Sequence, residues 1–123
     1  MAFGKSLEGI GERIVTFGKS GTITKGTHEG QVATVVAGPA VKVSASTNKV
    51  AGIIKKINDD NIGVQIGGIM KADYSGSAPT AGAVNNLEAD GSGGVNVDAG
   101  NGDPFFVWEV DTTNTKVYFS RAL

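Results

Sequence analysis

The side chains that could do chemistry are few, and their spacing brings no reactive set together. His28 is the single histidine and the chain has no cysteine, so a multi-histidine or thiolate metal site is excluded. A Ser-His-Asp triad would need only one histidine, but no G-x-S-x-G motif marks a nucleophile, and the serines lie in turn-like settings. Because His28 stands in the turn-like sequence THEG (27–30), we predict a surface turn residue rather than a catalytic base.

Two acidic stretches invite comparison with cation sites, namely NDDN at 58–61 and DAGNGD at 98–103. Calcium loops place oxygen ligands at alternating positions around a glycine, as in D-x-[DN]-x-[DN]-G, and neither stretch has that register. The GSGG run at 91–94 lacks the flanking residues of phosphate-binding loops. The sequence therefore predicts no catalytic, cofactor-binding or metal-binding residue and no cofactor, and it does not indicate an enzyme.

Length and charge narrow the class of protein. The 123 residues are enough for one domain with its own core. Net charge is uneven along the chain: +1 over residues 1–30, +3 over 31–72 and −5 over 73–123. A nucleic-acid partner is not expected, because no basic stripe is present to neutralise phosphates. No apolar run approaches the roughly 20 residues that span a bilayer, and no signal-peptide core is seen at the start, so no membrane partner is expected either.

The elements that would position any site are short strands. Apolar residues alternate over a few positions at a time, and glycine, proline, asparagine or aspartate interrupts each run. The 19 glycines fit many tight turns. A bulge or bend is expected at Gly67-Gly68, where the alternation slips. The expected strands cover 12–19, 22–25, 31–37, 40–46, 50–57, 62–74, 83–89, 95–97, 105–111 and 116–120.

These runs predict an all-β fold. We expect a small single-domain β-barrel or β-sandwich of short antiparallel strands, with residues 12–123 as the β-rich domain and residues 1–11 as a flexible, extended N-terminal arm. In the arm, Phe3, Leu7 and Ile10 share one helical face, but three glycines weigh against a stable free helix. In the closing hairpin, Phe106, Trp108 and Val110 are expected on one face, with Trp108 as a core residue or interface anchor.

The order of these motifs resembles that of the small head-decoration, or capsid cement, proteins of tailed bacteriophages. The resemblance covers about residues 20–120, and its matching positions are GII at 52–54, VQIG at 64–67, YSGSAP at 74–79, LEADGSGGV at 87–95 and VD at 110–111. Each motif is short, and it is their succession that is typical of the family.

The resemblance implies a non-enzymatic structural protein of the virion. It would be made in the host cytoplasm, bind the outer surface of the mature icosahedral head, and bridge neighbouring major capsid protein subunits. It would form a homotrimer or self-contacts at threefold positions. The candidate capsid contacts are Phe3, Leu7, Ile10 and Arg13. Two alternatives stay open: another β-rich phage module (tail tube, tail completion or head-fibre base), and an enzyme or carbohydrate-binding β-domain.

Overall fold

The computed structural model describes residues 10–36, 40–98, 100 and 102–122. These residues contain ten strands and no helix, which confirms the all-β prediction. Residues 1–9 of the predicted arm, including Phe3 and Leu7, lie outside the described residues. The strands are β1 Arg13–Lys19, β2 Val32–Val36, β3 Ala40–Val43, β4 Gly52–Ile57, β5 Asn61–Gly67, β6 Met70–Asp73, β7 Ala83–Ala89, β8 Val95–Val97, β9 Asp103–Asp111 and β10 Lys116–Arg121.

The first five strands form the N-terminal sheet, in the order β1-β3-β2-β4-β5. The pairing returns from β5 to β1, so the ladder of hydrogen bonds runs in a ring. The seam between β1 and β3 is parallel and only two residue pairs long, Gly18 with Ala40 and Lys19 with Val41, whereas the other ladders are antiparallel. This seam is a local exception in a fold whose strands otherwise pair antiparallel, as predicted.

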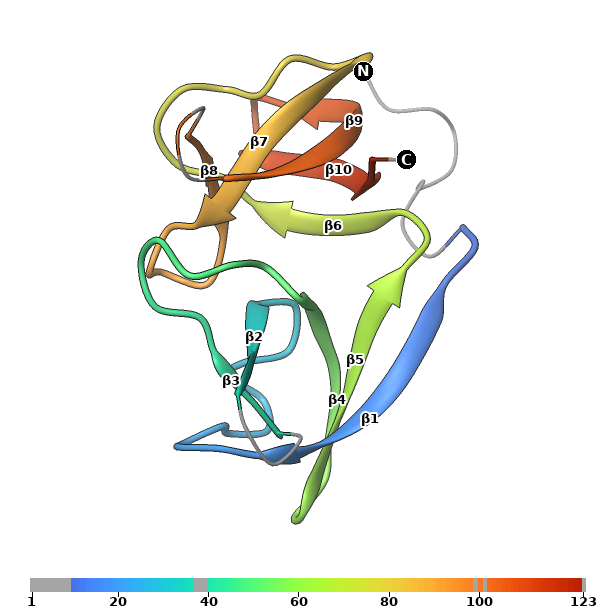
Figure 1. Ribbon diagram of the computed structural model, residues 1–123, viewed down its shortest axis with the longest axis vertical. Helices are drawn as coiled ribbons and strands as arrows, with labels where there is room; N and C mark the ends of the chain where they lie inside the picture. The colour runs from blue at the N-terminus through green and yellow to red at the C-terminus, as the bar shows by residue number, and fades with distance from the viewer. Residues whose placement is uncertain (1–9, 37–39, 99, 101, 123) are drawn as a thin grey trace.

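The last five strands form the C-terminal sheet, in the order β6-β10-β9-β7-β8. All of its ladders are antiparallel. At its end, Tyr74 forms a single parallel bridge with Val95 of β8. Figure 1 shows the C-terminal sheet stacked on one end of the N-terminal sheet, with β6 running along the junction.

Two clusters of buried side chains make the core. The interior of the N-terminal sheet is aliphatic and consists of Ile23, Ala33, Ile54, Ile57, Ile62 and Val64. The larger cluster is built on Phe105, Phe119, Met70 and Leu87 of the C-terminal sheet, and it also takes in Val32, Val50 and Ile53 from the N-terminal half. Because one cluster draws on both halves, the two sheets are packed as one body.

The expected bend at Gly67-Gly68 is confirmed. β5 ends at Gly67, Ile66 is the extra residue in the β1–β5 register, and Gly68 has φ of 77°. A Cβ on Gly68 would lie 2.4 Å from the carbonyl carbon of Gly11. Only glycine fits both the left-handed backbone and this close approach, so the two glycines together let the chain turn from β5 into β6.

The strand expected at residues 22–25 is absent. The backbone there leads into turns, in which Thr24 O accepts hydrogen bonds from the N–H groups of Thr27 and His28, both at 3.1 Å. Ile23 still supplies a buried side chain. The alternation in this short stretch therefore reflects one core contact and local turn bonding rather than strand pairing; β1 pairs with β5 and β3 instead.

Gln65 lies between Val64 and Ile66 in β5, and it is not exposed as polar residues usually are. Its side chain is fully buried, and its Nε2 donates to the carbonyls of Gly67 and Ile69, both at 3.0 Å. Gln65 pairs with Ile53, which packs in the cluster of the C-terminal sheet, while Val64 packs in the N-terminal interior, so both faces of β5 are buried there. The amide instead satisfies backbone carbonyls that the bend removes from the ladder.

Candidate interaction surface

An exposed apolar surface lies on the outer face of the C-terminal sheet. Val84 of β7, Phe106 of β9 and Ser120 of β10 lie side by side in the strand register. Trp108 follows two residues after Phe106. Val84 and Trp108 remain 56% and 47% exposed. We call Val84, Phe106 and Trp108 the outer apolar face.

A β-bulge at Trp108 decides which side chains share this face. Val107 pairs with Phe119 but Glu109 pairs with Tyr118, so β9 carries one extra residue between these pairs. The bulge turns Glu109 outward beside Trp108, and Val110 instead packs against the core. The predicted grouping of Val110 with Phe106 and Trp108 is therefore wrong, because simple alternation cannot anticipate the extra residue.

The two aromatic rings are held in a fixed geometry. Their centroids are 4.9 Å apart at an interplanar angle of 72°, an edge-to-face contact. Trp108 Nε1 donates to Ser120 Oγ at 2.9 Å. The face borders an open groove of about 290 Å³ that Ser120, Arg121 and Ala122 complete. A rigid aromatic pair loses little conformational entropy on binding, which suits an interaction surface.

Arg121 joins the groove to the N-terminal sheet. Its Nε donates to Ile66 O at 3.2 Å and its Nη2 to Ala51 O at 2.5 Å. The guanidinium carbon also lies 5.7 Å from the centre of the Phe105 ring, within cation–π range. Arg121 therefore ties the last strand to two carbonyls of the other sheet and fixes that end of the groove.

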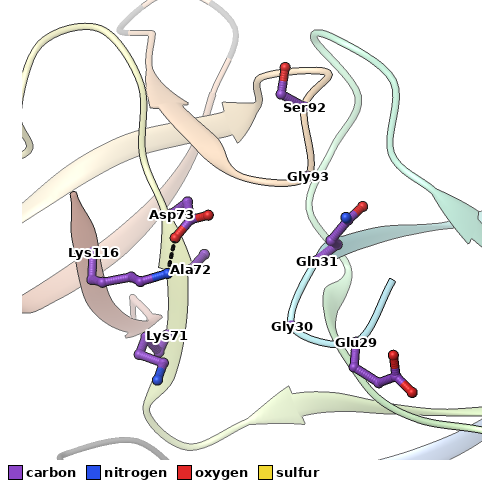
Figure 2. A pocket seen from close by; sticks show the side chains of 9 residues that line it. All are labelled: Glu29, Gly30, Gln31, Lys71, Ala72, Asp73, Ser92, Gly93 and Lys116. Atoms are coloured by element: carbon purple, nitrogen blue, oxygen red, sulfur yellow. Dashed lines mark hydrogen bonds and ion pairs between the residues drawn. The ribbon is translucent and has the colours of Figure 1, made fainter. Parts of the chain in front are cut away.

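A second hollow, a polar cleft of about 330 Å³, opens between β6 and the turns that precede β2. Figure 2 shows Lys71, Asp73 and Lys116 on one wall, with Gln31 and the Ser92-Gly93 loop opposite. Lys116 Nζ forms an ion pair with Asp73. Glu29 accepts the Gly26 N–H on both carboxylate oxygens, at 2.8 and 3.1 Å. The charges of Lys116, Asp73 and Glu29 therefore engage neighbouring groups of the protein.

The residues considered for chemistry lie in turns. His28 Nδ1 accepts the Thr24 N–H at 2.8 Å, which fits the predicted turn role. Asp59 and Asp60 are exposed in the β4–β5 turn, and Asp98 Oδ1 accepts the Gly100 N–H. Among the described residues, no group of three or more His, Cys, Asp or Glu side chains could hold a metal ion. No helix long and apolar enough to span a bilayer occurs in that part of the chain.

Two of the four predicted capsid contacts can be placed. Ile10 is exposed, and its carbonyl accepts the Ile69 N–H at 2.9 Å. Arg13 is exposed at the start of β1, paired with Gly67. Both therefore lie at the β5–β6 bend. The sequence analysis did not identify Val84. The available signal was the aromatic pair at spacing two in 105–111, because aromatic residues favour apolar partners on the neighbouring strand.

One titrating group is shifted at the end of the C-terminal sheet. In the β9–β10 turn, hydrogen bonds from the Asn114 side chain and backbone, and from the Thr113 N–H, lower the pKa of Asp111. These donors favour the charged carboxylate. The shift supports a tight turn and indicates no reactive acid.

Comparisons with known proteins add no further support for the fold or for this surface. Comparison of the chain with protein-family models, with curated proteins and with solved structures finds no match.

Proposed function

We propose that this protein is a structural component of a tailed-phage virion and has no catalytic activity. It binds the outer surface of the mature icosahedral head and bridges neighbouring major capsid protein subunits, to which a homotrimer or self-contacts at threefold positions would present several copies of one face. The order of motifs shared with head-decoration proteins supports this role. The all-β scaffold is compatible with it, and His28 and Asp98 are hydrogen-bonded within turns.

The observation that carries the proposal is the outer apolar face. Interaction sites concentrate binding energy in a few aromatic anchors at a desolvated centre with a polar rim. Phe106 and Trp108 have that form: they are rigid, partly exposed and flanked by Glu109, Ser120 and Arg121. We assign this face to the capsid contact, together with the predicted arm residues Phe3, Leu7, Ile10 and Arg13.

Stabilisation would follow from multivalency. A unit that touches two or three capsid subunits binds the assembled lattice much more tightly than a free subunit, because the second contact is intramolecular. A ligand that binds only the assembled state stabilises that state by mass action. The added contacts must break before neighbouring subunits can separate.

Co-sedimentation with mature heads lacking the protein tests the proposal. We expect stoichiometric binding to expanded heads and weak binding to unexpanded shells. Val84→Ser should reduce affinity by about tenfold, because it removes apolar area beside the aromatic anchors. Val35→Ser changes an equally aliphatic, 48% exposed side chain of the N-terminal sheet and should leave binding unchanged. Absence of binding, or polymerisation of the protein into tubes, would contradict the proposal, the latter in favour of a tail role.

A further inference from the structure

One edge of β1 has no strand beside it over most of its length. Among the described residues, β5 pairs with β1 from Arg13 to Gly18 on one side, whereas β3 joins the other side only at Gly18 and Lys19. Figure 1 shows β1 along the outside of the molecule, with β5 on its inner side. An edge of this kind presents backbone N–H and C=O groups that can pair with another strand.

The hydrogen bonds of the neighbouring strands show which residue of β1 bonds to β5. Ile54 of β4 donates its N–H to Gln31 O at 2.9 Å and accepts the Gly30 N–H at 2.7 Å, so its backbone groups turn away from β5. Val64 of β5 is paired with Ile54 on one side and with Val15 of β1 on the other. Because bonding directions alternate along a strand, Val64 exchanges its hydrogen bonds with Val15.

Ile14 and Thr16, on either side of Val15, therefore direct their N–H and C=O groups away from β5 and toward the free edge. No backbone or side-chain group of another described residue forms a hydrogen bond with them there. Both residues are exposed, and the Ile14 side chain is 48% exposed. The register with β5 is continuous from Ile14 to Gly18, so these groups stand in a regular extended strand.

The same edge lacks the features that usually keep strand edges from pairing. Residues 14–17 read IVTF, which are residue types favoured in strands, without a charge or a proline. The two outer strands of the C-terminal sheet differ: β8 has only three residues, and β6 carries the charged residues Lys71 and Asp73. Short length and charge both discourage pairing with another chain. Among the described strands, the β1 edge is therefore the one suited to pairing.

A second copy of β1 matches this edge. If two β1 strands run antiparallel about a two-fold axis beside Val15, Ile14 of each copy lies opposite Thr16 of the other, and the outward groups of both residues are paired. Arg13 then lies opposite Phe17 of the second copy, so no like charges meet. Because β1 has one free edge, the pairing closes at two copies and does not continue into a fibre.

We propose that two copies of the free protein pair through their β1 edges and so join their N-terminal sheets into one. Backbone groups make most of this contact, and the outer apolar face of the C-terminal sheet takes no part in it. The inference concerns the free protein and does not rest on the capsid role. A pairing this short buries less than the roughly 1,200–2,000 Å² of a stable complex, so we expect mostly monomer at about 1 μM and mostly dimer at about 1 mM.

Sedimentation velocity over this concentration range tests the proposal. Ile14→Lys should weaken the dimer roughly tenfold, because a lysine on the edge opposes pairing. Val35→Lys is the matched control: Val35 is also 48% exposed but lies on β2, between β3 and β4 in the sheet order, and the dimer should keep its affinity. A parent chain that stays monomeric at the highest concentration would overturn the proposal. So would equal weakening by both variants, or assembly beyond two copies.

A disulfide tests the register of the pairing without disturbing the edge. The chain has no cysteine, so Val15→Cys introduces a single thiol. Across the two-fold axis the two copies of residue 15 form a non-hydrogen-bonded pair with Cα atoms about 4.5 Å apart, a separation that a disulfide can bridge. With oxidised glutathione we expect a covalent dimer from Val15→Cys and little from Val35→Cys, although position 35 is more exposed. Equal cross-linking at the two positions would contradict the two-fold pairing.

Discussion

The two sheets use their apolar residues differently. The N-terminal sheet pairs in a ring around an aliphatic interior, and its exposed apolar side chains, Ile10, Ile14 and Val35, lie on different elements. The C-terminal sheet is open, has an aromatic core and adds an aromatic pair on its outer face. Scattered apolar residues are ordinary on any surface, whereas a gathered, rigid set is not. This difference is the reason for proposing the second sheet, and not the first, as the contact surface.

Charge follows the same division. Residues 31–72 carry a net charge of +3, whereas residues 73–123 carry −5. The outer apolar face therefore lies on the acidic part of the chain, and a partner with a basic rim around an apolar centre would suit it best.

The largest expected effect tests whether the two sheets unfold together or separately. Phe105→Ala in the C-terminal core should cost about 3–5 kcal/mol, and Ile62→Ala in the N-terminal interior about 2–5 kcal/mol. Since one cluster contains Val32 and Ile53 as well as Phe105, we expect each variant to shift a single transition, followed by circular dichroism and by Trp108 fluorescence. Two transitions, each moved by only one of the variants, would show that the sheets are independent units.

Gly52→Ala tests how closely the N-terminal strands must approach. A Cβ at this position would lie 2.1 Å from Gln65 O, which is backbone and cannot move alone. We expect a loss of about 1–3 kcal/mol from overpacking, measured by urea denaturation. Gly100→Ala, where the nearest atom is 3.5 Å away in a side chain, should change stability little. Equal effects at the two positions would mean that β4 and β5 are less tightly paired than described.

Arg121→Met sharpens the account of the junction between the sheets. The substitution keeps an apolar stem but removes two hydrogen bonds to carbonyls and the cation–π contact. A loss of about 1–2 kcal/mol is expected. Arg13→Met removes an exposed arginine from β1 and should stay within about 0.5 kcal/mol in the same denaturation assay. If both variants lost a similar free energy of unfolding, the contacts of Arg121 would not stabilise the junction between the sheets.

The smallest effect concerns pH at the β9–β10 turn. Because the folded-state pKa of Asp111 is lowered, its contribution to stability is present above the unfolded-state pKa and is lost as pH falls through the folded-state value. The stability difference between the parent and Asp111→Asn should therefore shrink between roughly pH 6 and pH 2. Asp59→Asn is the control. A difference that does not change with acidification would contradict this role of the carboxylate.

Most of the fold could be predicted because strand signals are local. The β4–β5 and β9–β10 hairpins and the bend at Gly67-Gly68 follow from alternation and from turn residues. The parallel seam between β1 and β3 could not be predicted, because it depends on where strands distant in sequence meet. The burial of Gln65 could not be predicted for a related reason: it pairs with Ile53, which packs in the cluster built on the other sheet.

The candidate surface was predicted only in part. Trp108 was expected as a core residue or anchor, but the bulge that turns Glu109 outward and Val110 inward has no clear sequence signal. Val84 belongs to the surface only because it pairs with Phe106 across the sheet, and this pairing cannot be read from the spacing of residues in the sequence. The polar cleft likewise joins segments far apart in the chain, from Glu29 to Lys116.

A density map of mature heads decorated with this protein tests the central claim most directly. We predict density on the outside of the capsid at sites where major capsid subunits meet, with the outer face of β7, β9 and β10 turned toward the shell and the aromatic pair in contact with it. An exterior without this density, or copies whose Val84, Phe106 and Trp108 face solvent away from any neighbour, would contradict the account.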